Sequence, residues 1–440
     1  MSVEVPRPCG YGRQWNQTLA ETGWWHSFEL PDGSEIRGVN NVDGLKMRIR
    51  QFPIAENLVG KRVLDVGAWD GWFSFEMERR GADVLAIDCW TNPRFREIHS
   101  LLKSKVEFRE MDVYDLSPET VGRFDIVLFM GVLYHLKHPL LALERICSVT
   151  SDMAAVDSYV LASKTDPKAR PVLELYETDE FEGNIDNWVA PNLAGLLAMC
   201  RTAGFARVDL RKMLPFSACV ACFRKWESGI SAHSPVIELL AATHDMNQGI
   251  NFSSKRDEYL SAYLKTSEKG LGLDEFMPQV GGFGVRPIYA KPLSESVWQL
   301  KFKLPPGLPA GWHHVCLRVK NGPPSNVRRI AIDVPLGVST PVISGLRDSA
   351  TWQANELNLT AGSVVAIWVR ALPENADRHN VGVTMDRENC DVEFVSESAG
   401  DDARQVNIRV RQDLTAGLKD LVLQSGDQSS EPVPLNVVRN

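Results

Sequence analysis

The spacing of apolar residues divides the chain into two regions. Between residues 61 and 230, short apolar runs alternate with stretches in which apolar residues recur every three or four positions. This alternation is typical of βαβ units, in which a parallel sheet carries helices on both faces. Beyond about residue 230, apolar and polar residues alternate between Pro and Gly turns, which predicts an all-β region.

Each apolar run of the first region is predicted to form a strand. These runs are Val63–Val66, Val84–Ile87, Val106–Phe108, Ile126–Phe129, Met153–Val160, Val208–Leu210 and Ala218–Phe223. A helix is predicted over Pro191 to Ala203, where the apolar residues follow helical spacing and Gly204 ends the pattern. Residues 1–60 combine aromatic residues with turn formers, and a helical pattern from Lys46 to Asn57 indicates a preceding cap.

The all-β region repeats itself with an offset of 106 residues. Ser-Pro-Val-Ile at Pro235 recurs as Thr-Pro-Val-Ile at Pro341 (341 − 235 = 106), and the glycine at Gly311 recurs at Gly417 (417 − 311 = 106). Two units of about a hundred residues, each with several short strands, are typical of tandem immunoglobulin-like sandwiches. We expect these units to serve as spacers, or as surfaces for a homo-oligomer or a protein partner.

The predicted fold class is therefore α/β, with a Rossmann-like doubly wound domain followed by two all-β immunoglobulin-like domains. The expected boundaries are 1–60 for the cap, 61–228 for the Rossmann-like domain, and 232–335 and 338–440 for the two sandwiches.

Composition and charge narrow the classes of function. The 440 residues are 44% hydrophobic and 24% charged, with a net charge of −8, which is the ordinary balance of a globular protein. Affinity for nucleic acid depends largely on neutralised phosphates, so an acidic balance argues against extended nucleic-acid contact. The first residues lack the apolar segment of a leader, and no run of 18 apolar residues occurs, so we expect a cytoplasmic protein without a membrane anchor.

The strongest chemical signal is the segment from Lys61 to Phe75, KRVLDVGAWDGWFSF, a strand followed by a glycine turn and a helix. A nucleoside cofactor requires backbone to pass close by, and a side chain at Gly67 or Gly71 would obstruct it. The helix opening near Gly71 directs free N–H groups at a bound carboxylate, such as that of S-adenosylmethionine. A dinucleotide usually requires G-x-G-x-x-G, whereas Trp69 stands at the middle glycine. We expect Asp65 and Ala68, with Trp69 and both glycines, to surround the cofactor.

Two acids follow the glycine turn. Asp88 ends the second strand, where a carboxylate accepts both ribose hydroxyls in Rossmann-type sites. Asp112, with Val113 beside it, follows the third strand and is placed to accept from the adenine amino group. A solvated turn or a helix cap explains either acid alone, but their order after a glycine turn makes the combination more specific.

The fourth strand leads into a loop at the edge of the sheet where open α/β sheets bind ligands. Met130 and Gly131 are expected beside the cofactor, and Tyr134 and His135 are expected to project into the cleft. His135 is the candidate general base, because its ordinary pKa lets it accept a proton near neutral pH. A buried structural histidine is the alternative. His138 lies nearby, but without cysteines or a third histidine we expect no metal site.

The segments VLDVGAWDGWFSFEMERRGA and FDIVLFMGVLYHLKHPL resemble the class I methyltransferases, and specifically the family of the bacterial tRNA wobble-uridine carboxymethyl transferase. The resemblance covers roughly residues 20–225, and GVLYHLKHP is its most distinctive part. It implies that Asp65, Gly67 and Gly71 surround the methionine arm, Asp88 the ribose and Asp112 the adenine. It also implies that Lys46 and Tyr134 face the transferred group.

The chain departs from the tRNA enzymes at one informative position. Those enzymes hold a carboxylated cofactor with a Lys, a Tyr and a late Arg, and the Arg falls near Pro215 to Ser217, where this chain has Pro-Phe-Ser. Without that cation a second carboxylate is poorly compensated. Ordinary S-adenosylmethionine is therefore the expected cofactor.

Acceptor contacts are expected from the segments after the fifth strand. Glu174, Tyr176, Trp188 and Asn192 are placed to orient a hydroxyl-bearing acceptor, although an exposed acidic loop with one buried tryptophan is the alternative. The predicted function is methyl transfer to oxygen or nitrogen of a small-molecule or sugar-like acceptor. Two alternatives stay open: tRNA wobble-uridine modification, and a non-catalytic interaction protein with a degenerate methyltransferase domain.

Overall fold

The computed structural model describes residues 23–161, 165–181, 183–214, 216–227, 237–246, 250–334, 340–372, 376–378, 381–397, 403–425 and 428–439. The chain forms two compact units. The first comprises residues 1–249, 253–309 and 314–327, and the second comprises residues 250–252, 310–313 and 328–440.

The first unit is built around a seven-stranded sheet with the order β10-β11-β7-β6-β3-β4-β5. Its strands are β3 (Arg62–Val66), β4 (Asp83–Asp88), β5 (Glu107–Glu110), β6 (Phe124–Met130), β7 (Thr150–Tyr159), β10 (Arg207–Met213) and β11 (Ser217–Phe223). Every strand predicted for this region is present. The two halves of the sheet extend in opposite directions from β3 and β6, which places a topological switch point between these two neighbours.

The sheet is mixed, which corrects the expectation of a purely parallel one. Strands β3 to β7 pair in parallel, but β11 runs antiparallel to β7 and to β10. The reason is the connection between β10 and β11, which is a short turn closed by the Leu214 N–H donating to the Ser217 carbonyl at 2.8 Å. A turn of this length reverses the chain, whereas parallel strands require a long crossover.

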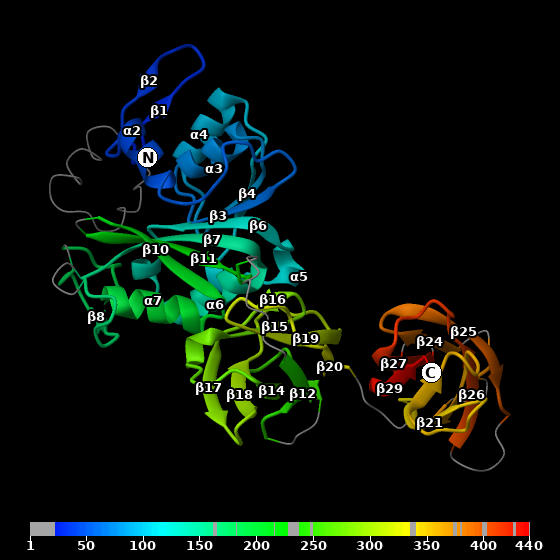
Figure 1. The fold of residues 1–440 in the computed structure, drawn as a ribbon. Helices are drawn as coiled ribbons and strands as arrows, with labels where there is room; N and C mark the ends of the chain where they lie inside the picture. The colour runs from blue at the N-terminus through cyan, green and yellow to red at the C-terminus, as the bar shows by residue number, and fades with distance from the viewer. Residues whose placement is uncertain are drawn as a thin grey trace. The chain divides into compact units, whose positions relative to one another are not determined.

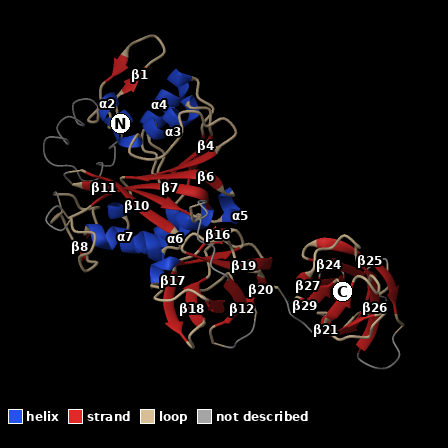
Figure 2. Cartoon of the chain, in the orientation of Figure 1, coloured by secondary structure: helices blue, strands red, loops and turns tan. Residues whose placement is uncertain are grey.

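Helices cover both faces of the sheet (Figures 1 and 2). One face carries α2 (Val42–Ile49), α3 (Trp72–Arg79) and α4 (Pro93–Leu102), and the other carries α5 (Pro118–Val121), α6 (Pro139–Val149) and α7 (Leu193–Thr202). The short strands β1 (Phe28–Glu29) and β2 (Glu35–Ile36) pair ahead of α2. The Rossmann-like prediction is thereby confirmed.

The helix predicted from Lys46 to Asn57 is displaced towards the N-terminus. It begins after Asn41, whose side chain accepts the Gly44 N–H, and it ends at Ile49. Pro53 follows closely, and a helix rarely continues into a proline. The first helical turn was missed because Asn41 was not recognised as an N-cap.

Alternate residues of the strands enter two separate cores. Cys219 belongs to the core beneath α2 to α4, whereas Cys222 belongs to the core beneath α6 and α7. These two cysteines, spaced as C-x-x-C, thus lie on opposite faces of β11. In the described part of the chain, no helix is long and apolar enough to cross a membrane.

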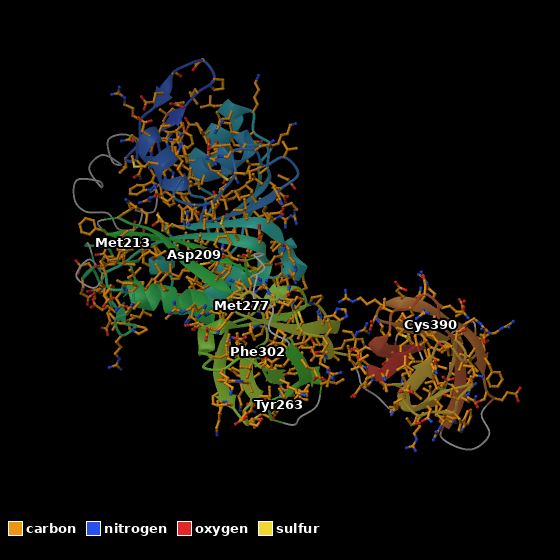
Figure 3. All side chains as sticks on the ribbon, in the orientation of Figure 1. Asp209, Met213, Tyr263, Met277, Phe302 and Cys390 are labelled. Atoms are coloured by element: carbon orange, nitrogen blue, oxygen red, sulfur yellow. The ribbon has the colours of Figure 1, made fainter. Side chains whose placement is uncertain are left out.

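The rest of the first unit is β-rich. An antiparallel sheet has the order β12-β14-β18-β17, from β12 (Ile237–His244), β14 (Tyr259–Thr266), β18 (Val297–Lys303) and β17 (Pro287–Pro292). A further strand, β15 (Phe276–Val280), pairs with β16 (Phe283–Gly284) and with β19 (Gly311–Val319). Figure 3 labels Tyr263 on β14 and Phe302 on β18, and Phe302 is fully buried. The short turn η3 (Leu273–Glu275) lies between β14 and β15.

These strands pack directly on the seven-stranded domain. The guanidinium of Arg224, which is fully buried, donates to the Pro306 carbonyl at 3.0 Å and lies 4.0 Å from the centre of the Phe283 ring. The Lys303 ammonium pairs with Glu144 of α6 at 2.9 Å. These contacts join the β-rich part of the first unit to the Rossmann-like domain.

The second unit consists of strands throughout its described residues. They are β13 (Asn251–Phe252), β20 (Arg328–Ile332), β21 (Val342–Asp348), β22 (Glu356–Asn358), β23 (Val364–Arg370), β24 (Val381–Met385), β25 (Glu388–Val395), β26 (Ala403–Arg409), β27 (Gly417–Ser425), β28 (Gln428–Ser429) and β29 (Val433–Val438). Inward residues of β21 to β27 and of β29 form a separate apolar core. The prediction of an all-β second half is confirmed for the described residues.

The internal repeat is visible in the strands themselves. Strands β18 and β19 begin at residues 297 and 311, and β26 and β27 begin at residues 403 and 417, so both pairs are offset by 106. Gly311 and Gly417 share an unusual backbone conformation, with φ of 131° and 128°. Ser325 and Ser430 each accept a backbone N–H, from Leu317 and Leu423 respectively, at 3.0 Å. Pro235, the first anchor of the repeat, lies outside the described residues.

Candidate functional site

A cavity of about 420 Å³ opens at the carboxyl ends of β3, β4, β5 and β6. This is the edge at which open α/β sheets bind ligands, and the volume lies within the range of small-molecule sites. Six residues predicted from the sequence line it: Gly67, Asp88, Asp112, Val113, His135 and Trp188. Residues from five segments that are distant in the sequence therefore meet in one cavity.

Several lining residues were missed. They include Cys89, Tyr114, Val132 and Lys137. Each lies one or two positions from a predicted residue in the same loop, so the loops themselves were the available signal. Among the described residues, no group of three or more His, Cys, Asp or Glu is arranged to hold a metal ion.

Neighbouring side chains of the protein itself leave no room for a Cβ at either glycine of the turn. Gly67 has a φ of 74°, and a Cβ there would lie 2.4 Å from a methyl carbon of Val132. Gly71 has a φ of 89°, and its Cβ would meet the rings of Phe75 and Phe95 at 2.6 and 2.7 Å. Gly71 does not line the cavity. It permits close packing of α3, which corrects the expectation that a side chain there would obstruct the cofactor.

Trp69 and Ala68 lie beside the cavity without lining it. The Trp69 ring packs against Trp90, with ring centres 5.7 Å apart, so it does not fill the turn. The Trp69 backbone N–H donates to the Asp88 carboxylate at 3.0 Å. Ala68 is buried in the core beneath α3. Both residues shape the turn, and the structure does not place their side chains at the cavity.

Asp88 is held in place by the backbone before any ligand arrives. Its carboxylate accepts N–H groups from Trp69 and Trp90, while burial raises its pKa above the ordinary value. Burial, together with Asp88, raises the pKa of the neighbouring Cys89 thiol to about 11. The cavity therefore contains a fixed carboxylate beside a thiol that is protonated at neutral pH.

Asp112 serves as a cap and also lines the cavity. Its side chain accepts the Tyr114 N–H at 2.9 Å at the start of η1 (Val113–Asp115). This bond engages one carboxylate oxygen. The helix-cap interpretation and a ligand contact are thus compatible for this residue.

Asp65 supports the turn from behind. Its side chain is buried, accepts the Ser74 hydroxyl at 2.6 Å and does not line the cavity. Burial raises the pKa of Asp65 to about 6, although the Ser74 hydrogen bond opposes the shift. The structure gives Asp65 a supporting role in the turn, and its direct contact with the cofactor stays a prediction.

Replacing Asp65 by Asn is expected to increase stability at pH 7. The pKa is about 6 in the folded protein and about 3.9 in an unfolded chain. Between these values the folded state retains a proton that the unfolded state has released, so the free energy of unfolding falls as the pH rises from about 4 to 6. Above pH 6 the free energy of unfolding is lower by a constant amount of about 2–3 kcal/mol because of this pKa difference.

Urea unfolding of wild type and Asp65→Asn at pH 4.5 and pH 7 measures this effect. The free energy of unfolding of Asp65→Asn should lack the pH dependence that Asp65 contributes. The variant should therefore be more stable than wild type at pH 7. Asp83→Asn, at an exposed position on the adjacent strand, should keep the wild-type slope. An equal pH slope in wild type and Asp65→Asn would contradict the assignment.

His135 lines the cavity, and its Nδ1 lies 3.2 Å from the Asp186 carbonyl oxygen. A carbonyl oxygen only accepts, so the neutral ring carries its proton on Nδ1 and leaves the lone pair on Nε2. Burial lowers the pKa of His135 and thereby favours the neutral ring. A neutral imidazole with a free Nε2 lone pair has the form that a general base requires.

Tyr134, Met130 and Gly131 do not line the cavity. The Tyr134 ring is buried against aromatic neighbours, with the Phe181 ring centre 6.4 Å away. Met130 is buried in the core, and the Gly131 N–H donates to the Asp157 carbonyl at 2.8 Å. The expectation that Tyr134 projects into the cleft is corrected, because the 3₁₀ turn η2 (Leu133–His135) directs it towards the aromatic cluster.

Lys46 also lies elsewhere. Its ammonium pairs with Glu29 at 2.9 Å and faces a second cavity, which it shares with Trp72. The residue of α2 that approaches the central sheet is Arg48, whose Nε lies 3.0 Å from the buried Asp157 carboxylate. Residues two apart on a helix point in nearly opposite directions. The prediction that Lys46 faces the transferred group is therefore corrected.

The predicted acceptor residues separate in the structure. Trp188 lines the cavity. The Tyr176 hydroxyl donates to Glu174 at 3.1 Å, and burial, assisted by Glu174, raises the pKa of Tyr176 to about 12. Neither of these two residues lines the cavity.

Asn192 is a helix cap. Its side-chain oxygen accepts the N–H groups of Gly195 and Val172, and its amide donates to the Arg170 carbonyl at 2.8 Å. It is buried, with 2% of its surface exposed. Since the side chain is engaged by backbone on both sides, the prediction of an acceptor contact is corrected to an N-cap of α7.

The strand order and the glycine turn define a Rossmann-like domain. Residues 41–206 match the family model described as a methyltransferase domain. The chain is 34% identical over 120 residues to the ubiquinone biosynthesis O-methyltransferase of Acinetobacter baylyi, which covers 26% of this chain and 48% of that protein. It is 36% identical over 118 residues to the Bordetella avium protein of the same name, covering 26% and 46%. The chain thus spans about half the length of these relatives.

The chain is also similar to several solved structures, among them the following two. One is the N-terminal domain of EvdMO1 in the presence of SAH and D-fucose, with 21% identity, a TM-score of 0.35, and coverage of 48% of this chain and 94% of that chain. The other is Burkholderia thailandensis 1,6-didemethyltoxoflavin-N1-methyltransferase, with 20% identity, a TM-score of 0.30, and coverage of 37% and 70%.

Proposed function

We propose that this protein is an S-adenosylmethionine-dependent methyltransferase that acts on oxygen or nitrogen of a small-molecule or sugar-like acceptor. The single observation that carries the proposal is the cavity at the carboxyl edge of the sheet, where Gly67, Asp88, Asp112 and His135 meet. The match of residues 41–206 to a methyltransferase domain supports it.

The residues of the cavity fit this cofactor. Gly67 lines the cavity at the turn after β3, and Asp88 presents a prefixed carboxylate suited to ribose hydroxyls. Asp112 and Val113 line the part of the cavity that follows β5 and suit the adenine. When bound, the cofactor supplies an electrophilic methyl group on a sulfonium.

The chain's own contribution is alignment and proton transfer. The backbone turn and the two acids orient the bound nucleoside, which lowers the barrier by fixing the reacting geometry. His135 Nε2 accepts the proton of the acceptor group, while the Asp186 carbonyl retains the proton on Nδ1. A fixed nitrogen base can accept the proton of a hydroxyl group. This suits the O-methyl transfer that the names of the relatives state.

Calorimetric titration with S-adenosylmethionine and S-adenosylhomocysteine tests the proposal. Saturable 1:1 binding of both is expected. Absence of binding to either nucleoside would overturn the proposal and favour the non-catalytic alternative.

His135→Ala is expected to reduce turnover about 10²- to 10⁴-fold, the usual contribution of a general base. Affinity for S-adenosylhomocysteine should change much less. Turnover is followed as S-adenosylhomocysteine release, with an acceptor identified from a panel of hydroxylated small molecules. His99→Ala is the matched control, since His99 lies on α4 and bonds the Val106 carbonyl. Undiminished turnover in His135→Ala would remove this residue from catalysis.

The tRNA-modification alternative receives less support. It requires Lys46 beside the transferred group, whereas Lys46 pairs with Glu29. Residue 215, within the stretch where those enzymes carry an arginine, lies outside the described residues. We therefore retain ordinary S-adenosylmethionine and a small acceptor as the proposal.

For the β-rich repeats we propose immunoglobulin-like sandwiches that act as a spacer or a partner-binding surface. The conserved offset of β18 and β19 from β26 and β27 supports two copies of one fold. Antiparallel strands with inward apolar residues are typical of that architecture.

A further inference from the structure

The cofactor cavity has a wall that the sheet does not provide. Strands β8 (Leu173–Leu175) and β9 (Val189–Pro191) form a small hairpin, and the segment between them includes the loop of residues 183–188. Trp188, at the end of this loop, lines the cavity together with His135 and Lys137. The loop thus faces the same space as the proposed general base.

Three contacts join this loop to the segment that follows β6. The Trp188 N–H donates to the Tyr134 carbonyl at 2.9 Å. The Lys137 ammonium lies 4.1 Å from the centre of the Trp188 ring, a cation–π geometry. The Asp186 carbonyl oxygen lies 3.2 Å from His135 Nδ1. The loop therefore contacts His135 directly and also contacts residues on both sides of it.

The Asp186 carbonyl decides which ring nitrogen of His135 carries the proton. In water, neutral imidazole favours the Nε2–H tautomer, which has no lone pair on Nε2. A carbonyl acceptor at Nδ1 reverses this preference and leaves Nε2 free to accept a proton. The position of this carbonyl therefore controls whether His135 can act as a base.

Asn187 follows Asp186 directly in the loop. Its side chain is buried, with 1% of its surface exposed, and its amide donates to the Phe181 carbonyl at 3.2 Å. Phe181 is itself fixed by aromatic neighbours, with the Tyr159 ring centre 4.3 Å away. Asn187 lies between Asp186 and Trp188, the two residues that contact the segment after β6. One buried amide thus connects a rigid aromatic cluster to the loop.

We propose that Asn187 is a positioning residue, which acts through the Asp186 carbonyl to keep His135 in the tautomer with a free Nε2. The inference rests on the proposed function, because the tautomer matters only where His135 accepts a proton. The purely structural alternative is that Asn187 closes the loop without affecting the imidazole. The two interpretations differ in what they predict for the His135 ring.

The test is ¹⁵N NMR of the full chain labelled at histidine, with and without saturating S-adenosylhomocysteine. The His135 signals are assigned by their absence in His135→Gln. Wild type should show His135 mainly with the proton on Nδ1. Asn187→Leu, which removes the amide at similar volume, should change the major form to Nε2–H. Turnover should fall about tenfold or more, as expected for a base held in the wrong tautomer.

Asn184→Ala is the matched control. Asn184 is an asparagine of the same loop. It donates to the Phe181 carbonyl through its backbone N–H and not through its side chain. Among the described residues its buried side-chain nitrogen has no hydrogen-bond partner. It should therefore keep the wild-type tautomer.

Asn187→Asp provides a second variant in case Asn187→Leu does not fold. It keeps the shape but places an oxygen against the Phe181 carbonyl, and the same change of tautomer is expected. An unchanged Nδ1–H form in a folded Asn187 variant would overturn the proposal, as would the same change in Asn184→Ala. If no nucleoside binds, the proposed function fails, while the spectrum of the ligand-free protein still tests the positioning role.

Discussion

Replacing Asp88 by Ala is expected to weaken binding of S-adenosylhomocysteine at least 100-fold. The carboxylate is held by the N–H groups of Trp69 and Trp90 at the end of β4. Two hydrogen bonds from ribose hydroxyls to a charged acceptor contribute about 1.5–3 kcal/mol each. Every 1.4 kcal/mol corresponds to a tenfold change in affinity, so their loss exceeds two orders of magnitude. Calorimetric titration measures the effect.

Asp83→Ala is the matched control for this experiment. Asp83 begins the same strand that Asp88 ends, so it lies at the opposite edge of the sheet. Its replacement should leave affinity for S-adenosylhomocysteine within about twofold of wild type, since exposed substitutions usually change free energies by less than 0.5 kcal/mol. Nearly unchanged affinity in Asp88→Ala would refute the ribose assignment.

Gly67→Ala is expected to destabilise the protein by about 2–5 kcal/mol and to abolish nucleoside binding. A non-glycine residue in the left-handed region costs about 1–2 kcal/mol, and Gly67 has a φ of 74°. The new Cβ would also lie 2.4 Å from a Val132 methyl carbon, and overpacking of this kind typically costs about 1–3 kcal/mol. Val132 lines the cavity, so its displacement alters the site. Chemical denaturation and calorimetry measure both effects.

Two further variants separate the backbone cost from the clash. Gly60→Ala has the same left-handed requirement, with a φ of 78°, but no atom within 4 Å of the added Cβ, so it should show only the backbone cost. Adding Val132→Ala to Gly67→Ala removes the obstructing methyl groups and should recover part of the stability. If Gly60→Ala and Gly67→Ala were equally destabilised, the steric role of Val132 would be wrong.

The sequence predicted the parts of the site that follow directly from strand endings. Gly67 and Asp112 closely follow β3 and β5, Asp88 ends β4, and the carboxyl ends of parallel strands share one edge. Their meeting in one cavity therefore follows from topology alone. The placement of Lys46 was implied by the family resemblance alone, and only the structure shows that Lys46 pairs with Glu29 while Arg48 pairs with the buried Asp157. Asn192 was misassigned because a capping asparagine and a ligand-binding asparagine look alike without their partners.

The pattern of apolar residues by itself determined the order of strands and helices, the all-β second half and its internal repeat. These features depend on periodicity within a few neighbouring residues, which the chain carries locally. Tertiary structure alone decided which side chains face the cavity, which nitrogen of His135 holds its proton, and that Trp188 joins the cofactor wall. Those outcomes depend on contacts such as that between His135 and Asp186, 51 positions apart, and no local pattern specifies the distance between such residues.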